Sequence, residues 1–181
     1  MKKSLVLAAA AAALGFAAPA FAQMPSVGPV SYYGNLGYSS FNGIGGVDPD
    51  FQGVTARLGA RFGQYFGVEG EGTAGFNSDH LDLAGTHANV RLTDEYAGYA
   101  VGYVPLAPNA DLLARIGYGA TNFHATAPGV SQGSTDNSWN FGAGAQYFFT
   151  HSDGLRADYT YYDYNTGPNA NVWSVAWVHK F

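Results

Sequence analysis

The stretch VTARLGARFG, residues 54–63, alternates between two kinds of residue at every position. Its apolar members are Val54, Ala56, Leu58, Ala60 and Phe62. The positions between them hold threonine, arginine or glycine, with the arginines at 57 and 61. Because successive side chains of a β-strand point to opposite faces, this pattern predicts a strand with one apolar face and one polar face.

Eight stretches of about ten residues alternate in this way and predict strands. They cover residues 30–40, 54–63, 66–76, 94–104, 112–121, 138–149, 155–162 and 172–181. Their connections are short at 63–65, 105–110 and 150–153, and mostly longer and polar at 42–50, 77–93, 125–137 and 163–171. An even number of such strands, with short turns at one end and long loops at the other, is typical of barrels that cross a membrane. We therefore expect an all-β fold, an eight-stranded antiparallel up-and-down transmembrane β-barrel.

The composition excludes several other classes of protein. The 181 residues include no cysteine, which excludes a disulfide framework. The formal net charge is −5, so the chain has no basic excess with which to neutralise nucleic-acid phosphates. Hydrophobic residues make up 47% of the chain, which is enough to bury an apolar surface and argues against intrinsic disorder.

Residues 1–22 have the three parts of a secretory signal peptide. Lys2 and Lys3 form a basic start, an apolar run covers residues 5–18, and AFA at 20–22 is a small-residue cleavage motif. A membrane anchor is the alternative, but the apolar run is short for a helical span of about 20 residues. We expect the signal to be cleaved, leaving a single β-barrel domain over residues 23–181. An even strand number then places both barrel termini on the periplasmic side.

The sense of the alternation separates a membrane barrel from a secreted soluble β-sandwich or lipocalin-like barrel. A soluble barrel turns its apolar residues inward and its charges outward. Here, five of the six basic residues after residue 22 lie on the face that is rich in glycine, threonine and serine. Tryptophan and phenylalanine lie on the opposite face, where a soluble protein would expose them to water. The pattern favours a polar interior and an apolar surface that faces lipid.

Aromatic residues are concentrated at both ends of the predicted lipid-facing surface. One expected belt contains Tyr32, Phe62, Phe66, Tyr103, Tyr147, Phe149 and Phe181, and the other contains Tyr38, Phe76, Trp139, Tyr161 and Trp173. Such belts are typical of the two membrane–water interfaces. In the stretch 94–104, we assign Tyr99, Val101 and Tyr103 to this outward face.

The glycine-rich face carries charges of both signs, which we expect to form a network in the lumen. Its members are Arg57, Arg61, Glu69, Glu71, Arg115, Arg156, Asp158 and Lys180. Cross-strand ion pairs are available there, and unpaired charges would be costly. Because an eight-stranded barrel is just wide enough for side chains to fill it, we interpret the network as a structural plug. A narrow, gated ion path is the alternative.

The long connections and the strand ends beside them hold eight acidic residues: Asp48, Asp50, Asp79, Asp82, Asp94, Glu95, Asp136 and Asp163. One hypothesis is that they hold divalent cations shared with lipopolysaccharide phosphates, but we favour a solvated loop surface. His80, His87 and His124 lie at the same end. Scattered surface histidines are far commoner than metal sites, so we expect no metal and no cofactor.

Two motifs that suggest an enzyme are set aside because of their context. GEGTAG at 70–75 has the spacing of a dinucleotide-binding loop, but it lies inside a predicted strand with no helix after it. HSD at 151–153 has the residue types of a hydrolase triad, but three consecutive residues in a turn do not converge as a relay. We expect no enzymatic activity.

The C-terminal stretch VWSVAWVHKF, residues 172–181, ends in phenylalanine and has aromatic residues at alternate positions. It resembles the signal by which the barrel-assembly machinery recognises outer-membrane barrels. The positions that carry this resemblance are Trp173, Val175, Trp177 and Phe181. Ala176 and His179 depart from the usual form, in which glycine and an apolar residue are common at these positions.

The segments 58–71, 98–105 and 114–119 look like hairpins of small OmpA-like, opacity-type outer-membrane proteins. The resemblance implies an outer-membrane location in a bacterium of the Gram-negative type. We expect a role in envelope integrity or surface interaction with a plugged lumen; the alternative is a low-conductance porin for small solutes or ions. The expected partners are outer-membrane lipid, lipopolysaccharide and the barrel-assembly machinery. We expect a monomer that binds no nucleic acid.

Overall fold

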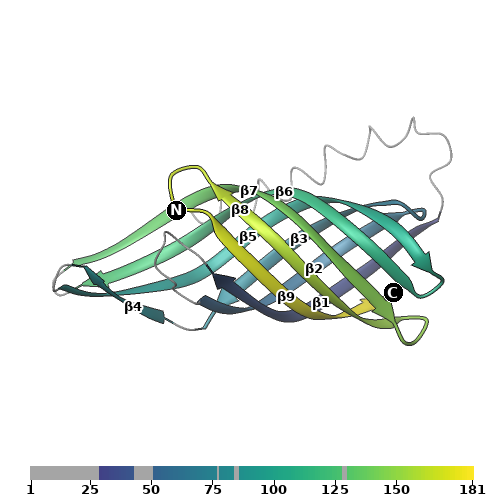
Figure 1. Cartoon of the computed structure of the whole chain (residues 1–181), viewed down its shortest axis with the longest axis horizontal. Coiled ribbons are helices and arrows are strands. Elements are labelled where there is room, and N and C mark those ends of the chain that lie inside the picture. Colours follow the sequence, from purple (N-terminus) through teal and green to yellow (C-terminus); the bar gives the residue numbers. More distant parts are fainter. Residues whose placement is uncertain (1–28, 43–50, 77, 84–85, 128–129) are drawn as a thin grey trace.

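The computed structural model shows a β-barrel built from antiparallel strands (Figure 1). It describes residues 29–42, 51–76, 78–83, 86–127 and 130–181. Within these residues the strands are β1 (Val30–Asn42), β2 (Phe51–Phe62), β3 (Phe66–Gly75), β4 (Ser78–Leu83), β5 (Thr86–Ala107), β6 (Ala110–Ala127), β7 (Val130–Phe148), β8 (Asp153–Tyr164) and β9 (Ala170–Lys180). β3 and β4 both pair with β5, each with a different part of it, and so occupy one strand position in the barrel. The nine segments therefore make an eight-stranded barrel. No helix among the described residues is long and apolar enough to cross a membrane.

The barrel closes on itself. Every strand pairing is antiparallel, and β1 pairs with β9 to complete the ring. In this closing register, Tyr33 lies opposite Lys180 and Leu36 lies opposite Trp177. Closure leaves no free edge in the ring, which matters in lipid because unpaired backbone N–H and C=O groups find no water there. The predicted eight-stranded antiparallel barrel is confirmed.

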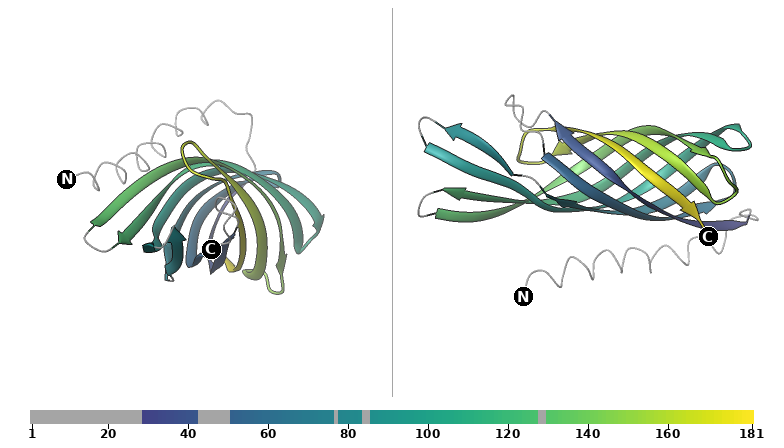
Figure 2. Two further views of the ribbon diagram at one scale, coloured as in Figure 1. Left: turned by 60° about the vertical axis from the view of Figure 1, so that its left-hand side comes forward. Right: turned by 90° about the horizontal axis from the view of Figure 1, so that it is seen from below.

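The two ends of the barrel differ. At one end, which we call the turn end, tight turns join β2 to β3, β5 to β6 and β7 to β8 (Figure 2). Gly63 in the first of these turns has a φ of 65°, a left-handed conformation that favours glycine. β1 begins and β9 ends here, and the backbone N–H of Phe181 donates to the carbonyl of Tyr32 at 2.9 Å. We call the opposite end the hairpin end.

The strands at the hairpin end are longer than the sequence predicts. We expected loops at 77–93 and 125–137, but β4, β5, β6 and β7 occupy most of these residues and project beyond the barrel (Figures 1 and 2). β6 and β7 stay paired as far as Ala127 and Val130. The loop prediction was wrong because polar composition indicates contact with water, and antiparallel strands that face water are also polar.

Inward and outward residues alternate as predicted along most of the barrel. On β2, Arg57 is 3% exposed whereas its neighbour Leu58 is 71% exposed. On β9, Ser174 is buried while Trp173 and Val175 are exposed. Apolar side chains therefore cover the outer surface, and the lumen holds the buried charged and polar side chains together with buried rings such as Phe41 and Phe51. An apolar outer surface is the arrangement that lipid surroundings require.

β5 is an exception to the predicted alternation. Tyr99, Val101 and Tyr103 are buried in the lumen, whereas Gly98 and Ala100 are exposed. The outward assignment of these three residues was wrong, as was the place of Tyr103 in an aromatic belt. A tyrosine ring is apolar but its hydroxyl needs a partner when buried, and the Tyr99 hydroxyl donates to Glu71 Oε1 at 3.0 Å. Hydropathy alone does not reveal such a partner.

Large aromatic side chains are exposed at both ends of the outer surface. They are Tyr32, Phe66, Tyr147, Phe149 and Phe181 at the turn end, and Tyr38, Phe76, Trp139 and Trp173 toward the hairpin end. Phe62 and Tyr161, which we also expected in the belts, are half-buried. Exposed rings at these two levels are typical of membrane–water interfaces.

Glycines on the inner face make room for the tyrosine rings. A Cβ atom on Gly117 would overlap the ring of Tyr99, and one on Gly59 would overlap the ring of Tyr33. The inner face of this narrow barrel is thus complementary in shape to rings that reach into the lumen.

This packing predicts opposite outcomes for two glycines on adjacent strands. Gly117→Ala should lower the free energy of unfolding by about 1–3 kcal/mol, because the added methyl group meets the Tyr99 ring and the Gly98 carbonyl. Gly98→Ala should be neutral or slightly stabilising, since no atom lies within 4 Å of a Cβ atom at this outward position. Urea unfolding in lipid vesicles, followed by tryptophan fluorescence, measures both. Equal effects at the two positions would contradict the inward orientation of Tyr99.

Candidate functional site

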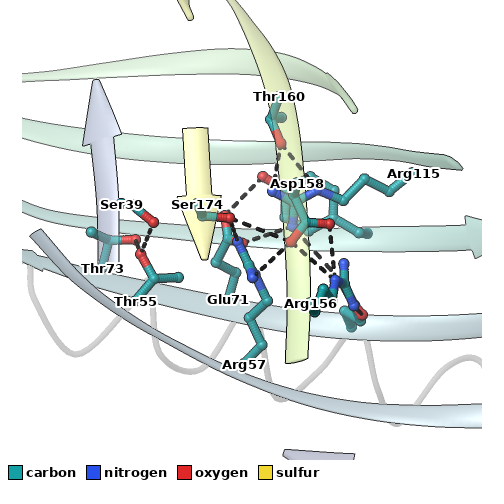
Figure 3. A network of polar contacts seen from close by, with 12 residues as sticks. Ser39, Thr55, Arg57, Glu71, Thr73, Arg115, Arg156, Asp158, Thr160 and Ser174 are labelled. Carbon is teal, nitrogen blue, oxygen red and sulfur yellow. Dashed lines mark hydrogen bonds and ion pairs between the residues drawn. The ribbon is translucent and has the colours of Figure 1, made fainter. Parts of the chain in front are cut away.

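The lumen contains a group of six charged side chains, all of them buried, which we call the central network (Figure 3). It consists of Arg57, Glu69, Glu71, Arg115, Arg156 and Asp158. They come from β2, β3, β6 and β8, so the network joins strands from different sides of the barrel. Their inward placement follows from the period-two alternation that puts each of them on a glycine-rich face.

Arg57 connects three strands to β2. Its Nε atom pairs with Glu71, and its Nη1 atom lies 3.2 Å from Asp158 Oδ2. Its Nη2 atom donates to the Ser174 hydroxyl at 2.9 Å. The N–H groups of one guanidinium therefore contact side chains on β3, β8 and β9.

Arg115 and Arg156 complete the network. Arg115 Nη1 lies 2.8 Å from Glu71 Oε2, and Arg115 Nε donates to the Thr160 hydroxyl at 3.1 Å. Arg156 pairs with Glu69 through Nη1 and with Asp158 Oδ1 through Nε at 2.9 Å. Three arginines thus face three carboxylates, and the charges balance.

Tyrosine hydroxyls supply further donors to the carboxylates. Glu71 Oε1 accepts hydrogen bonds from Tyr99 and Tyr162, each at 3.0 Å. Glu69 Oε1 accepts one from Tyr33 at 2.7 Å. The Tyr33 and Tyr103 hydroxyls lie 2.6 Å apart, and because Tyr33 donates to Glu69, Tyr103 is the donor in that pair. Sequence reasoning missed the four tyrosines as network members. The nearest signals were Tyr33, which alternates in phase with Asn35 and Ser39, and Tyr162, which alternates in phase with Asp158.

The other two predicted members, Arg61 and Lys180, lie apart from the central network, nearer the turn end. Arg61 donates to both oxygens of Asp111, at 2.8 and 3.1 Å, and its guanidinium carbon lies 4.2 Å from the centre of the Tyr103 ring. Lys180 Nζ lies 3.3 Å from the centre of the Phe148 ring. Asp111 is the partner that the sequence did not reveal, because it lies between a predicted turn and a predicted strand.

A row of hydroxyl groups, each in contact with the next, continues the polar lining of the lumen toward the hairpin end. Ser39 and Thr55 hydroxyls lie 2.6 Å apart, and those of Thr55 and Thr73 lie 2.8 Å apart (Figure 3). Thr73 lies opposite Glu95 in the β3–β5 register. The lumen is therefore lined with hydrogen-bonded polar groups on both sides of the level of Glu71.

Two of the expected loop acids are in fact buried. Glu95 is fully buried, with Oε1 3.4 Å from the Tyr162 hydroxyl and Oε2 without a hydrogen-bond partner among the described residues. Asp136 is also buried. Their assignment to a solvated loop surface was wrong. β5 and β7 extend through these positions, and both residues lie on the inward faces of their strands.

The remaining acids divide into two groups. Asp94 accepts a hydrogen bond from Asn122 at 2.6 Å, and Asp163 is exposed. Asp48 and Asp50 lie outside the described residues, and at Asp79 and Asp82 the backbone alone is described. Among the described side chains, no group of three histidines and acids is arranged to hold a metal ion.

The residues of the expected assembly signal share the outer face of β9 and its end. Trp173, Val175, Trp177 and Phe181 are all at least half exposed. Trp177 packs edge-to-face against Phe149, with ring centres 5.3 Å apart.

Charge balance in the central network makes a testable prediction. Arg115→Met should lower the free energy of unfolding by about 3–5 kcal/mol, because it leaves three buried carboxylates facing only two arginines. Adding Glu71→Gln should recover part of that loss, since the double variant is again balanced in charge. Arg61→Met, at the less buried pair with Asp111, should cost less than Arg115→Met.

Urea unfolding in lipid vesicles measures all three variants. A double variant no more stable than Arg115→Met alone would show that charge balance is not what the network provides.

Comparison with known proteins identifies the family. The family model described as outer membrane protein beta-barrel domain matches residues 8–181. No curated protein matches the chain in sequence. Solved structures do match, at identities that show the fold alone.

One of these structures is Ail, the attachment invasion locus protein of Yersinia pestis, in complex with the heparin analogue sucrose octasulfate. It has a TM-score of 0.65 and 16% identity, and the match covers 85% of this chain and 100% of Ail. Neisserial surface protein A has a TM-score of 0.54 and 12% identity, with 83% and 95% covered. The N-terminal β-barrel domain of Pseudomonas aeruginosa OprF has a TM-score of 0.54 and 13% identity, with 82% and 96% covered. The closed barrel and the family match lead to one conclusion: the chain belongs to the outer membrane protein β-barrel domain family.

Proposed function

We propose that this protein is a monomeric outer-membrane barrel whose lumen is plugged by its own side chains, and which serves envelope integrity or surface interaction. It has no enzymatic role in this proposal and carries no cofactor. Its partners are outer-membrane lipid and lipopolysaccharide, with the barrel-assembly machinery acting during insertion. Its turn end, with both barrel termini, faces the periplasm, and its hairpin end faces outward.

The central network is the observation that carries this proposal. Arg57, Arg115 and Arg156 extend from the wall to carboxylates on other strands, and all three are buried. A solute that passed through would have to displace paired, buried charges, each held by several hydrogen bonds. A barrel of eight strands leaves little width beside them.

The hairpin end supports a role in surface contact. β4 to β7 continue beyond the ring and form a projecting antiparallel sheet (Figure 1). Surface extensions of this kind are the part of an outer-membrane barrel that varies and carries interactions, whereas short turns connect strands.

Conductance tests the plug. In planar bilayers, the folded wild-type barrel should show conductance at least about ten-fold below that of a large porin, whose 16–18 strands leave an aqueous channel. The double variant Arg115→Ala/Glu71→Ala keeps the charge balance but empties part of the lumen, so it should conduct more than the wild type. Leu58→Ala, on the outer face next to Arg57, should leave conductance unchanged.

Heat-modifiable gel mobility first establishes that each variant is folded. Wild-type conductance as large as that of a porin would overturn the plug. Small but steady wild-type steps would instead favour the alternative, a low-conductance porin for small solutes or ions.

The proposed assembly signal has its own test. Phe181→Ala should slow insertion into vesicles that contain the assembly machinery, while leaving unaided folding in detergent unchanged. Phe66→Ala is the matched control, because Phe66 is also an exposed phenylalanine at the turn end but lies on β3. Equal slowing by both variants would indicate a loss of lipid anchoring and would contradict a signal specific to β9.

A further inference from the structure

The lumen contains a fourth buried carboxyl group, on Glu95, that stands outside the charge balance of the central network. Glu95 lies on β5 and is fully buried. The three arginines of the central network already face three carboxylates of other residues. Among the described side chains, no basic group forms an ion pair with Glu95, and its Oε2 atom has no hydrogen-bond partner. A negative charge on Glu95 would therefore have no cation of its own among these side chains.

Titratable and charged side chains reach Glu95 from several strands. They are Arg57 on β2, Glu71 on β3, Tyr99 on β5, Arg115 on β6, and Tyr162 and Tyr164 on β8, and Tyr164 also interacts with Asp136 on β7. Among the charged ones, Glu71 interacts most strongly with Glu95, and two ionised carboxylates repel each other. The two arginines attract a charge on Glu95 more weakly, because their guanidinium groups lie against Glu71. These surroundings favour a neutral Glu95.

The hydroxyl nearest to Glu95 has already given its proton to another group. Glu95 Oε1 lies 3.4 Å from the hydroxyl oxygen of Tyr162. A tyrosine hydroxyl has a single proton, and Tyr162 donates it to Glu71 Oε1 at the shorter distance of 3.0 Å. Thr73, which lies directly opposite Glu95 in the β3–β5 register, supplies one hydroxyl contact to the carboxyl. One neutral hydroxyl does not compensate a fully buried charge.

A proton on Glu95 satisfies this geometry. A neutral carboxylic acid has its own O–H donor, so Glu95 Oε1 can donate to the Tyr162 oxygen, which in turn donates to Glu71. The three groups then form one chain in which every proton has an acceptor. Oε2 becomes a neutral carbonyl oxygen, and burying it without a partner costs far less than burying a charge.

Apolar side chains cover this chain toward the hairpin end. The buried apolar cluster there consists of Phe41, Phe51, Tyr162, Tyr164, Ala170 and Val172. The rings of Phe41 and Tyr162 have centres 5.8 Å apart. Tyr162 therefore belongs both to the apolar cluster and to the chain that joins Glu95 to Glu71, so a change at Glu95 reaches the cluster through this ring.

We propose that Glu95 carries a proton in the closed barrel, and that loss of this proton loosens the lumen plug as a pH-sensitive switch. The inference rests on the proposed function, because the switch acts on a lumen that is otherwise plugged. Ionised Glu95 adds a second negative charge beside Glu71 and turns its Oε1 atom into an acceptor that faces the acceptor oxygen of Tyr162. Both changes push the Tyr162 ring away and disturb the apolar cluster.

Replacement of Glu95 by a neutral amide tests for the proton. Urea unfolding in lipid vesicles compares the wild type with Glu95→Gln between about pH 5 and about pH 8. An unfolded glutamate ionises above about pH 4.3, whereas folded Glu95 keeps its proton, so the folded wild type binds more protons than the unfolded chain. The unfolding constant of the wild type should therefore rise with pH by up to about ten-fold per pH unit relative to that of Glu95→Gln. At neutral pH, Glu95→Gln should be the more stable protein.

Glu69→Gln is the matched control, because it makes the same change at a carboxylate that is paired with Arg156. It should be less stable than the wild type at neutral pH, since it leaves a buried arginine without its partner. Heat-modifiable gel mobility establishes that each variant is folded before it is compared.

Two further measurements follow the proton and the switch separately. In infrared spectra at about pH 7, where exposed carboxyl groups are ionised, the carbonyl band of a protonated carboxylic acid should be present in the wild type and absent from Glu95→Gln. In planar bilayers, wild-type conductance should rise at least about three-fold from about pH 7 to about pH 10, as Glu95 loses its proton, and that of Glu95→Gln should stay constant.

The proton is disproved if Glu95→Gln loses stability at neutral pH as Glu69→Gln does, or if the infrared band persists in Glu95→Gln. Wild-type stability that falls when Na⁺ is exchanged for a bulky organic cation at constant ionic strength would mean that a metal cation is bound instead, and would also overturn the proposal. Wild-type conductance that does not change with pH would overturn the switch. Porin-sized conductance in both proteins at every pH would overturn the plug and the switch together, whereas the infrared band and the stability difference would still establish the proton.

Discussion

The guanidinium groups of Arg57, Arg115 and Arg156 lie against the carboxylates of Glu69, Glu71 and Asp158 inside a closed and narrow barrel. Buried charges of this kind are tolerable only when each one is paired and hydrogen-bonded. Their balance therefore constrains which strands meet across the lumen and how far apart the walls stand. Arginine is suited to such pairing because the N–H donors of its planar guanidinium group reach several acceptors at once.

The surroundings of the network follow from the same requirement. Each carboxylate has more acceptor capacity than the arginines fill, and tyrosine hydroxyls from β1, β5 and β8 supply further donors to Glu69 and Glu71. Tyrosine rings in a narrow lumen need space, which glycines such as Gly59 and Gly117 provide on the facing strands. The glycine excess and the inward tyrosines are thus two parts of one packing arrangement.

Outside the barrel the constraint is reversed, because lipid accepts apolar side chains and rejects unpaired backbone groups. Closure between β1 and β9 satisfies the backbone, and exposed residues such as Leu58 and Trp173 form the surface. Beyond the ring this requirement ends, and the extended parts of β4 to β7 carry polar and ionisable residues. The paired charges in the lumen and the polar hairpin end both support the proposal that this protein acts at its surface.

Alternation with period two was enough to determine the eight-stranded barrel, the sense of its faces and most lumen charges, because strand geometry forces neighbouring side chains apart. The alternation failed where the choice between the inner and the outer face depends on a partner far along the chain. Tyr99 turns inward because Glu71 accepts its hydrogen bond, and Asp111 belongs to the lumen because Arg61 reaches it. It also failed at β4 to β7, where polar composition is the same for a loop and for a paired strand in water. Composition and spacing describe local preference, whereas the pairing of distant groups, such as Glu71 with Arg115 and Arg57 with Asp158, exists only once the strands are in register.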